Sequence, residues 1–158
     1  NKEVMIMAES VLVGMSGGVD SSVAVFLLKS AGYDCLGATL KLYDKNDPYY
    51  KNCSFADSGI SSAQSVADAL QIPFHLLEHR CDFKSSVIDR FVFEYERGNT
   101  PNPCIICNKT VKFPLLFKKA DELNIDLVAT GHYARIGYNA ENGRYFIKKQ
   151  RKYKGIKK

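Results

Sequence analysis

Short apolar runs alternate along this chain with stripes of apolar residues at helical spacing. Ala63, Val66, Ala67 and Leu70 fall at i, i+3, i+4 and i+7, which is the spacing of one buried helix face. The apolar runs have the length of strands and lie at 11–13, 35–40, 73–77 and 127–130. Strands that alternate with helices in this way predict an α/β fold with a doubly wound, mainly parallel sheet.

Glycines and prolines indicate where the predicted helices end. The helix after the first run is expected to stop at Gly32, because glycine suits the residue that follows a helix end. The helix that carries the stripe around Ala63 should begin near Asp57 or Ser58. Later stripes cover 87–95 and 113–123. Between them, Gly98 ends one helix, and the two prolines of 99–103 are expected to forbid regular structure.

The last part of the chain predicts a β-hairpin. The runs 134–136 and 145–147 are joined through Asn142-Gly143, which is a turn signal. We expect this hairpin to start a second β element and not to complete the sheet. The predicted domains are therefore 1–135, which carries the chemistry, and 136–158, the start of an incomplete second region.

Composition limits the class of protein. The chain has 158 residues, 46% of them hydrophobic, which is enough for one moderate core. No apolar run approaches the roughly 20 residues that span a bilayer, and no signal peptide is evident. We therefore expect a cytoplasmic protein without a membrane partner. Five cysteines, an odd number, favour thiols used for chemistry or metal binding over a disulfide framework.

Positive charge is concentrated at one end of the chain. The formal net charge is +5, but 144–158 alone holds eight Lys or Arg residues and no acidic residue. Such a run is usually a solvated tail. It would also attract the phosphates of RNA in a manner that depends on salt and not on sequence. RNA is the expected polyanion, and DNA is not.

The segment 14–22 directly follows the first predicted strand and looks like a phosphate-binding loop. Adjacent Gly17 and Gly18 allow positive φ, and Asp20, Ser21 and Ser22 are expected to cap the next helix. A helix N-terminus with free amides attracts anions. An ordinary Gly-Gly turn is the alternative. The Walker pattern is excluded because no Gly-Lys-Ser or Gly-Lys-Thr follows.

A Cys-x-x-Cys pair, Cys104 and Cys107, follows the prolines. Nearby Lys109 and Lys112, together with a helix dipole, are expected to lower the thiol pKa values. A zinc site would need two further ligands, to be recruited from Cys53, Cys81 and His132. A thioredoxin-like redox pair is a second alternative. For Cys35, which lies in a predicted strand, plain burial is expected.

Three motifs in order, 14–22, 102–113 and 129–133, resemble the tRNA-specific 2-thiouridylase family, and the first also resembles the pyrophosphate loop of N-type ATP pyrophosphatases. The resemblance covers about 11–135. It implies an adenine nucleotide alpha-hydrolase-like fold that uses ATP and magnesium to thiolate C2 of the wobble uridine in tRNA. The sulfur would come from a persulfide carrier protein. The family's second catalytic cysteine lies downstream and is absent here, so the chain is expected to be a fragment that does not thiolate tRNA alone.

The resemblance also implies residue roles. Cys107 would be the sulfur-handling nucleophile. The ATP-binding residues would be Gly14, Met15, Ser16, Gly17, Gly18, Val19, Asp20, Ser21, Leu40 and Gly131, and the residues facing the target base or tRNA would be Asn102, Pro103, Cys104 and His132. Asp20 is the nearest acidic residue that could help to hold the magnesium ion. Many members of the family carry Asp at the position of Cys104. Because this chain has a second thiol there, a further hypothesis is an iron–sulfur cluster held by Cys104, Cys107 and a third cysteine.

Two other functions share the first motif or part of it. An amide-forming ligase, such as an NAD, GMP or argininosuccinate synthetase, or a tRNA lysidine synthetase, has the Ser-Gly-Gly-x-Asp-Ser core but does not need the cysteine pair. A nucleotide- or RNA-binding module without catalysis is the third hypothesis. Serine at both cysteines would leave such a ligase active, and pyrophosphate release from ATP would exclude the binding module.

Overall fold

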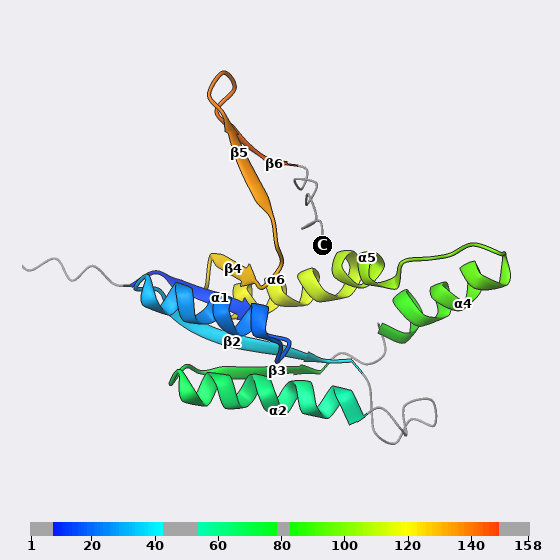
Figure 1. The fold of residues 1–158 in the computed structure, drawn as a ribbon, viewed down its shortest axis with the longest axis horizontal. Helices are drawn as coiled ribbons and strands as arrows, with labels where there is room; N and C mark the ends of the chain where they lie inside the picture. Colours follow the sequence, from blue (N-terminus) through cyan, green and yellow to red (C-terminus); the bar gives the residue numbers. More distant parts are fainter. Residues whose placement is uncertain (1–7, 43–53, 79–82, 149–158) are drawn as a thin grey trace, which may run out of the picture.

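The fold is built around one parallel sheet of four strands (Figure 1). The computed structural model describes residues 8–42, 54–78 and 83–148. The strands are β1 (Ser10–Gly14), β2 (Asp34–Lys41), β3 (Phe74–Glu78) and β4 (Leu127–Thr130), in the order β3-β2-β1-β4. Every neighbouring pair is parallel. All four strands expected from the apolar runs are confirmed.

Helices cover both faces of this sheet, so the doubly wound prediction is also confirmed. Helices α1 (Val19–Ser30) and α2 (Ser54–Ala69) pack on one face, where Val11, Val13, Val25 and Ala63 share a buried cluster. Helix α6 (Phe113–Glu122) packs on the other face through Leu116 and Ala120, against Leu12 of β1 and Ala38 of β2. Because β1 is buried on both sides, it is a continuous apolar run and not an alternating one.

The helix ends agree with the sequence in part. Helix α1 is capped at Ala31, and Gly32 adopts a φ of +92°. Helix α2 begins at Ser54, slightly earlier than the expected start near Asp57 or Ser58. Ala63 and Ala67 of α2 are fully buried, as their spacing predicted. A small side chain at these positions lets the helix lie close to the sheet.

The middle of the chain contains short helical segments at one end of the molecule (Figure 1). These are η1 (Lys84–Ile88), α4 (Asp89–Glu96), α5 (Pro103–Cys107) and η2 (Asn108–Lys112), of which the two η segments are π-helical. The expected helix over 87–95 is present. Its apolar stripe is only partly buried, since Val87 is 3% exposed whereas Val92 is 47% exposed.

The prediction that the proline segment lacks regular structure as far as Pro103 is wrong at its last residue. Pro103 is the first residue of α5, where its missing N–H costs no hydrogen bond. The Asn102 side chain caps this helix by accepting from the backbone N–H of Cys104 at 3.1 Å. From Pro103 the chain continues through η2 directly into α6.

Beyond β4, the strands β5 (Arg135–Asn139) and β6 (Arg144–Lys148) form the expected antiparallel hairpin. The hairpin is a separate two-stranded sheet that projects away from the main sheet (Figure 1). Gly143 in its turn has a φ of +67°. The division into domains at residue 135 stays a prediction. In the described part of the chain, no helix has the length and apolar character needed to cross a membrane.

Candidate functional site

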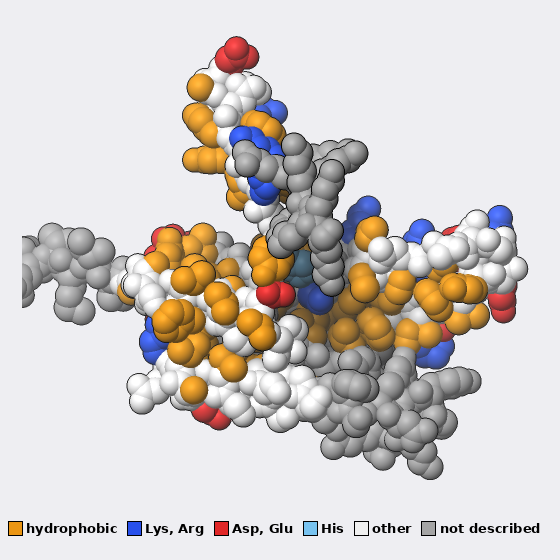
Figure 2. Space-filling view, in the orientation of Figure 1, with side chains coloured by type: hydrophobic (Ala, Val, Ile, Leu, Met, Phe, Trp, Pro, Cys, Tyr) orange, Lys and Arg blue, Asp and Glu red, His pale blue; other side chains and the backbone are white. Residues whose placement is uncertain are grey.

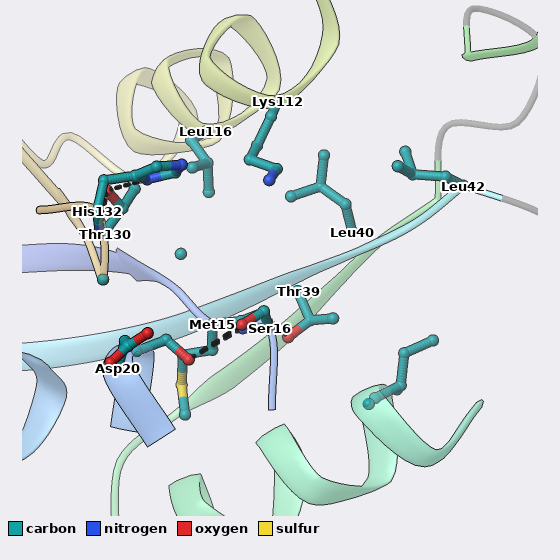
Figure 3. A pocket seen from close by; sticks show the side chains of 15 residues that line it. Met15, Ser16, Asp20, Thr39, Leu40, Leu42, Lys112, Leu116, Thr130 and His132 are labelled. Carbon is teal, nitrogen blue, oxygen red and sulfur yellow. Dashed lines mark hydrogen bonds between the residues drawn. The ribbon is translucent and has the colours of Figure 1, made fainter. Parts of the chain in front are cut away.

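The sheet has a topological switch point between β1 and β4, because the chain moves from β1 toward β2 and β3 and later returns to the other side of β1. Ligands of open α/β sheets bind outside the carboxyl ends of the strands at such a point. A cavity of about 360 Å³ lies there (Figure 3). Its lining residues are Gly14, Met15, Ser16, Asp20, Ser21, Thr39, Leu40, Leu42, Gly59, Ile60, Lys112, Leu116, Thr130, Gly131 and His132.

The loop from β1 to α1 forms one wall of this cavity. Gly17 has a φ of +78°, which side chains other than glycine rarely adopt, and a Cβ there would collide with the carbonyl of Gly59 in α2. Gly18 has a φ of −86° and an extended conformation. Only the first of the two glycines therefore needs positive φ.

The expectation that Asp20, Ser21 and Ser22 cap α1 is wrong. Gly18 is the N-cap residue, and no side chain among the described residues caps it. The hydroxyls of Ser21 and Ser22 instead donate to the Gly18 carbonyl, at 3.0 and 2.9 Å, because both residues lie inside the first turn of the helix. The first N–H groups of the helix thus have no intrahelical partner and remain available to an anion.

A second contact of Ser21 ties the loop together. Its hydroxyl oxygen accepts from the backbone N–H of Ser16 at 3.2 Å, and the hydroxyls of Ser16 and Ser21 are 3.3 Å apart. Ser21 is 4% exposed, so these bonds are largely shielded from water. The serines that were expected to cap the helix therefore hold the shape of the loop.

The strand β4 ends against the start of α1. A Cβ at Gly131 would lie 2.6 Å from the Ser21 nitrogen and 2.8 Å from the Asp20 carbonyl carbon, so only glycine fits this approach. The next residue, His132, is placed by Thr130, whose hydroxyl is 2.7 Å from His132 Nδ1. The His132 ring also lies 5.6 Å from the ring of Phe113 at the start of α6.

Asp20 is the one acidic residue among the described residues that line the cavity. Its Oδ1 accepts a hydrogen bond of 2.6 Å from the Tyr133 hydroxyl. This hydrogen bond, and then the negative charge of Asp20, raise the pKa of Tyr133. Magnesium in nucleotide sites is commonly held by one or two carboxylates together with substrate phosphates. An acidic side chain beside the helix N-terminus fits such an ion.

The structure brings together most of the predicted nucleotide-binding residues but not all of them. Those that line the cavity are Gly14, Met15, Ser16, Asp20, Ser21, Leu40 and Gly131, and His132 joins them. Gly17, Gly18 and Val19 instead line a shallow hollow between α1 and α2. The lining of the cavity does not include Asn102, which caps α5, or the α5 residues Pro103, Cys104 and Cys107.

The sequence interpretation missed other members of the lining, among them Thr39, Gly59 and Leu116. Thr39 is buried and donates from its hydroxyl to the carbonyl of Met15 at 2.7 Å, which fixes the end of β1 on β2. Its place at the carboxyl end of the second predicted strand was a usable signal. Gly59 lies within α2, and no local pattern marks it.

Cys104 and Cys107 are free thiols on α5, the first exposed and the second half-buried. Burial raises the pKa of the Cys107 thiol; the positive charge of Lys112 opposes this, and Cys104 adds a smaller increase. The expected lowering is therefore wrong for Cys107. Its side chain loses hydration on folding, and this loss outweighs the nearby positive charge.

No group of three or more His, Cys, Asp or Glu residues that could hold a metal ion is found among residues 8–42, 54–78 and 83–148. Cys35 is 2% exposed within the core beneath α1 and α2, so its expected burial is confirmed. Cys53 and Cys81, named for the zinc alternative, lie outside the described residues.

The fold and the site define an α/β domain with a ligand cavity at the switch point of its sheet. The N-terminus of α1 forms part of one wall of this cavity. The chain belongs to the tRNA methyl transferase HUP domain family, which it matches over residues 9–155. It is 49% identical over 148 residues to the tRNA-specific 2-thiouridylase MnmA of Clostridioides difficile and 50% identical over 148 residues to that of Clostridium acetobutylicum. These matches cover 92% and 90% of this chain. The resemblance inferred from the three motifs is confirmed.

The chain spans only 40% of the length of these two relatives. Among solved structures, it resembles the glutamine-dependent NAD⁺ synthetase of Acinetobacter baumannii in complex with ADP, with a TM-score of 0.54 and 17% identity. That similarity covers 77% of this chain and 21% of the synthetase. At this identity the likeness shows a shared fold, as expected for an α/β domain of this topology.

Proposed function

We propose that this chain is the ATP-binding part of an enzyme that replaces the C2 oxygen of the wobble uridine in tRNA with sulfur. One observation carries the proposal. The cavity at the switch point is lined by Lys112, whose charge also acts on the Cys107 thiol, and this supports a thiol that works beside a ligand bound in the cavity. The names of the relatives, which are 2-thiouridylases, support the same reaction.

ATP would lie with its phosphates against the loop 14–21 and the N-terminus of α1. The free N–H groups and the helix dipole favour an anion at this position. The adenosine would lie near Leu40 and Gly131, both of which line the cavity. Leu40 and Leu42 make one end of the cavity apolar (Figure 3). Asp20 would hold magnesium together with the phosphates, and the ion would neutralise charge on the leaving pyrophosphate.

The reaction would proceed in two displacements. The uridine O2 attacks the α-phosphorus of ATP, and pyrophosphate leaves. The terminal sulfur of a persulfide on Cys107 then attacks C2, and AMP leaves with the former O2. A second thiol, outside this chain, would break the remaining S–S bond, leaving sulfur on C2 and forming a disulfide with Cys107. The chain alone would therefore bind ATP without thiolating tRNA.

The tRNA would approach the carboxyl edge of the sheet. Asn102, Pro103 and Cys104 would face the target base, and His132, held by Thr130 at the rim of the cavity, would contact the tRNA. The region 136–158 would start a tRNA-binding element. The sulfur would be delivered to Cys107 by a persulfide carrier protein, and the cytoplasm is the expected location of this chemistry.

An iron–sulfur cluster on Cys104 and Cys107 is an alternative use of the same thiols. Its third ligand cannot be Cys35, which is buried among the residues beneath α1 and α2. Iron content and visible absorbance of protein purified without oxygen separate the two: a persulfide site contains no iron, and a cluster gives iron in proportion to protein.

The test uses the full-length enzyme with unmodified tRNA and compares wild type with Cys107→Ser. We expect the variant to release pyrophosphate from ATP in a single turnover but to form no 2-thiouridine, because adenylylation does not need the thiol. Cys35→Ala is the matched control and should keep both activities. An enzyme in which serine at both Cys104 and Cys107 leaves turnover intact would be an amide-forming ligase, and absence of pyrophosphate release would indicate a binding module.

A further inference from the structure

The phosphates of a bound nucleotide need more positive charge than the loop provides. The segment 14–22 contains no lysine or arginine. Among the described residues that line the cavity, Lys112 is the one lysine or arginine, and it comes from η2 on the opposite wall. In Figure 3 its amino group points into the cavity, between Leu116 and Leu40. A cation across from a helix N-terminus is well placed to contact phosphate oxygens.

The same amino group acts on the sulfur of Cys107. The positive charge of Lys112 lowers the pKa of that thiol and opposes the effect of burial. The two residues are five positions apart, and η2 between them is π-helical, with the Phe113 N–H bonded to the Asn108 carbonyl. A π-helical turn places residues i and i+5 on one side of the helix, and single π-helical turns are frequent at functional sites.

The geometry distinguishes Lys112 from its neighbours in η2. Val111 is buried, and Thr110 donates its hydroxyl to the Ile106 carbonyl within the helix. Lys109, the other lysine of η2, is exposed and does not line the cavity. Of the two lysines, only Lys112 therefore combines a place in the cavity wall with an electrostatic effect on Cys107.

We propose that Lys112 is a catalytic cation shared by the two halves of the site: it binds the nucleotide phosphates and stabilises the sulfur anion on Cys107. Its amino group makes no covalent bond in either step. While ATP is bound, it contacts phosphate oxygens. After pyrophosphate has left, its charge remains to hold the sulfur anion beside the adenylylated uridine. This inference rests on the proposed function. It adds Lys112 as the residue that couples adenylylation of the uridine to the attack by sulfur.

The test compares wild type, Lys112→Gln and Lys109→Gln in the full-length protein. The first measurement is the Kd for ATP by calorimetry. The second is the pH dependence of Cys107 alkylation by iodoacetamide without nucleotide, read from the Cys107 peptide by mass spectrometry. Lys112→Gln should weaken ATP binding by about tenfold or more, which corresponds to loss of one charge-assisted hydrogen bond. It should also move the alkylation midpoint to higher pH.

Lys109→Gln should change neither quantity, and Lys112→Arg should restore most of the ATP affinity because the charge is kept. A Lys112→Gln protein that is folded by circular dichroism and changes only one of the two quantities, or neither, overturns the shared role. If wild type itself does not bind ATP, the proposed function fails instead. The alkylation profile then still reports whether Lys112 stabilises the Cys107 thiolate.

Discussion

At the residue scale, the closest packing in the site is between Gly131 and the start of α1. We expect Gly131→Ala to destabilise the protein by about 1–3 kcal/mol, because the added methyl group would meet backbone atoms of Asp20 and Ser21 that cannot rotate away. Urea unfolding measures this. Gly18→Ala is the matched control, since a Cβ there meets nothing closer than 3.6 Å. Equal stability of the two variants would contradict the packing described.

The titration of Cys107 gives a second prediction at this scale. Burial raises its pKa, so the neutral thiol is favoured in the folded protein. The associated stability is fully present below the pKa of the unfolded chain and is lost as pH rises through the higher, folded value. Cys107→Ser should therefore remove a stability decrease at alkaline pH, as measured by thermal unfolding across pH. An unchanged pH profile in this variant would count against a raised pKa.

The sequence predicted residues that line the cavity where the signal was local. Gly14, Ser16 and Asp20 follow one strand directly, and their order alone indicated an anion site. Thr39 and Gly59 were missed because they reach the cavity from other strands and helices, which only the folded chain brings together. The error at Ser21 and Ser22 has a related cause: the position of the N-cap decides what a hydroxyl does, and sequence places helix starts only within a few residues.

At the scale of elements, α5 depends on its cap. Asn102→Ala should remove the acceptor for the Cys104 N–H and cost about 0.5–2 kcal/mol of stability. Asn102→Ser keeps a capping oxygen and should lie close to wild type in chemical denaturation. If alanine and serine have the same effect, the cap does not stabilise this helix.

The hairpin has two different faces. From the register, Ile136, Tyr138, Tyr145 and Ile147 share one face, and Phe146 lies on the other beside Lys148, whose amino group is 5.6 Å from the ring centre. Figure 2 shows hydrophobic and basic side chains on different sides of this projecting element. A basic face with an aromatic ring suits contact with RNA phosphates and bases.

This face predicts a salt effect on tRNA binding. Lys148→Gln should weaken the binding of tRNA by full-length protein and reduce the slope of log K against log salt concentration by roughly 0.7–0.9, the value for one lost phosphate contact. Lys118→Gln, which removes an exposed lysine of α6, is the charge-matched control and should leave the slope unchanged. Equal effects of both variants would assign the loss to net charge and not to the hairpin.

At the scale of the whole molecule, the sequence predicted the sheet because each of its four strands contains a compact apolar run, and it predicted the hairpin because Asn142-Gly143 marks its turn. It predicted α4 as a helix but could not foresee that Val92 would stay exposed, since burial depends on what packs against a helix. The π-helical turn in η2 has no signature in hydrophobic spacing. It nevertheless helps to explain how Lys112, in the cavity wall, also acts electrostatically on the Cys107 thiol.

The central claim is that ATP binds in the cavity between β1 and β4 with its phosphates on the first turn of α1. A crystal structure of the protein with magnesium and a non-hydrolysable ATP analogue tests it most directly. The account predicts phosphate oxygens within hydrogen-bond distance of the backbone N–H groups of the loop 16–21 and of the Lys112 amino group, with adenosine near Leu40. A nucleotide bound elsewhere, or phosphates turned away from α1, would contradict it.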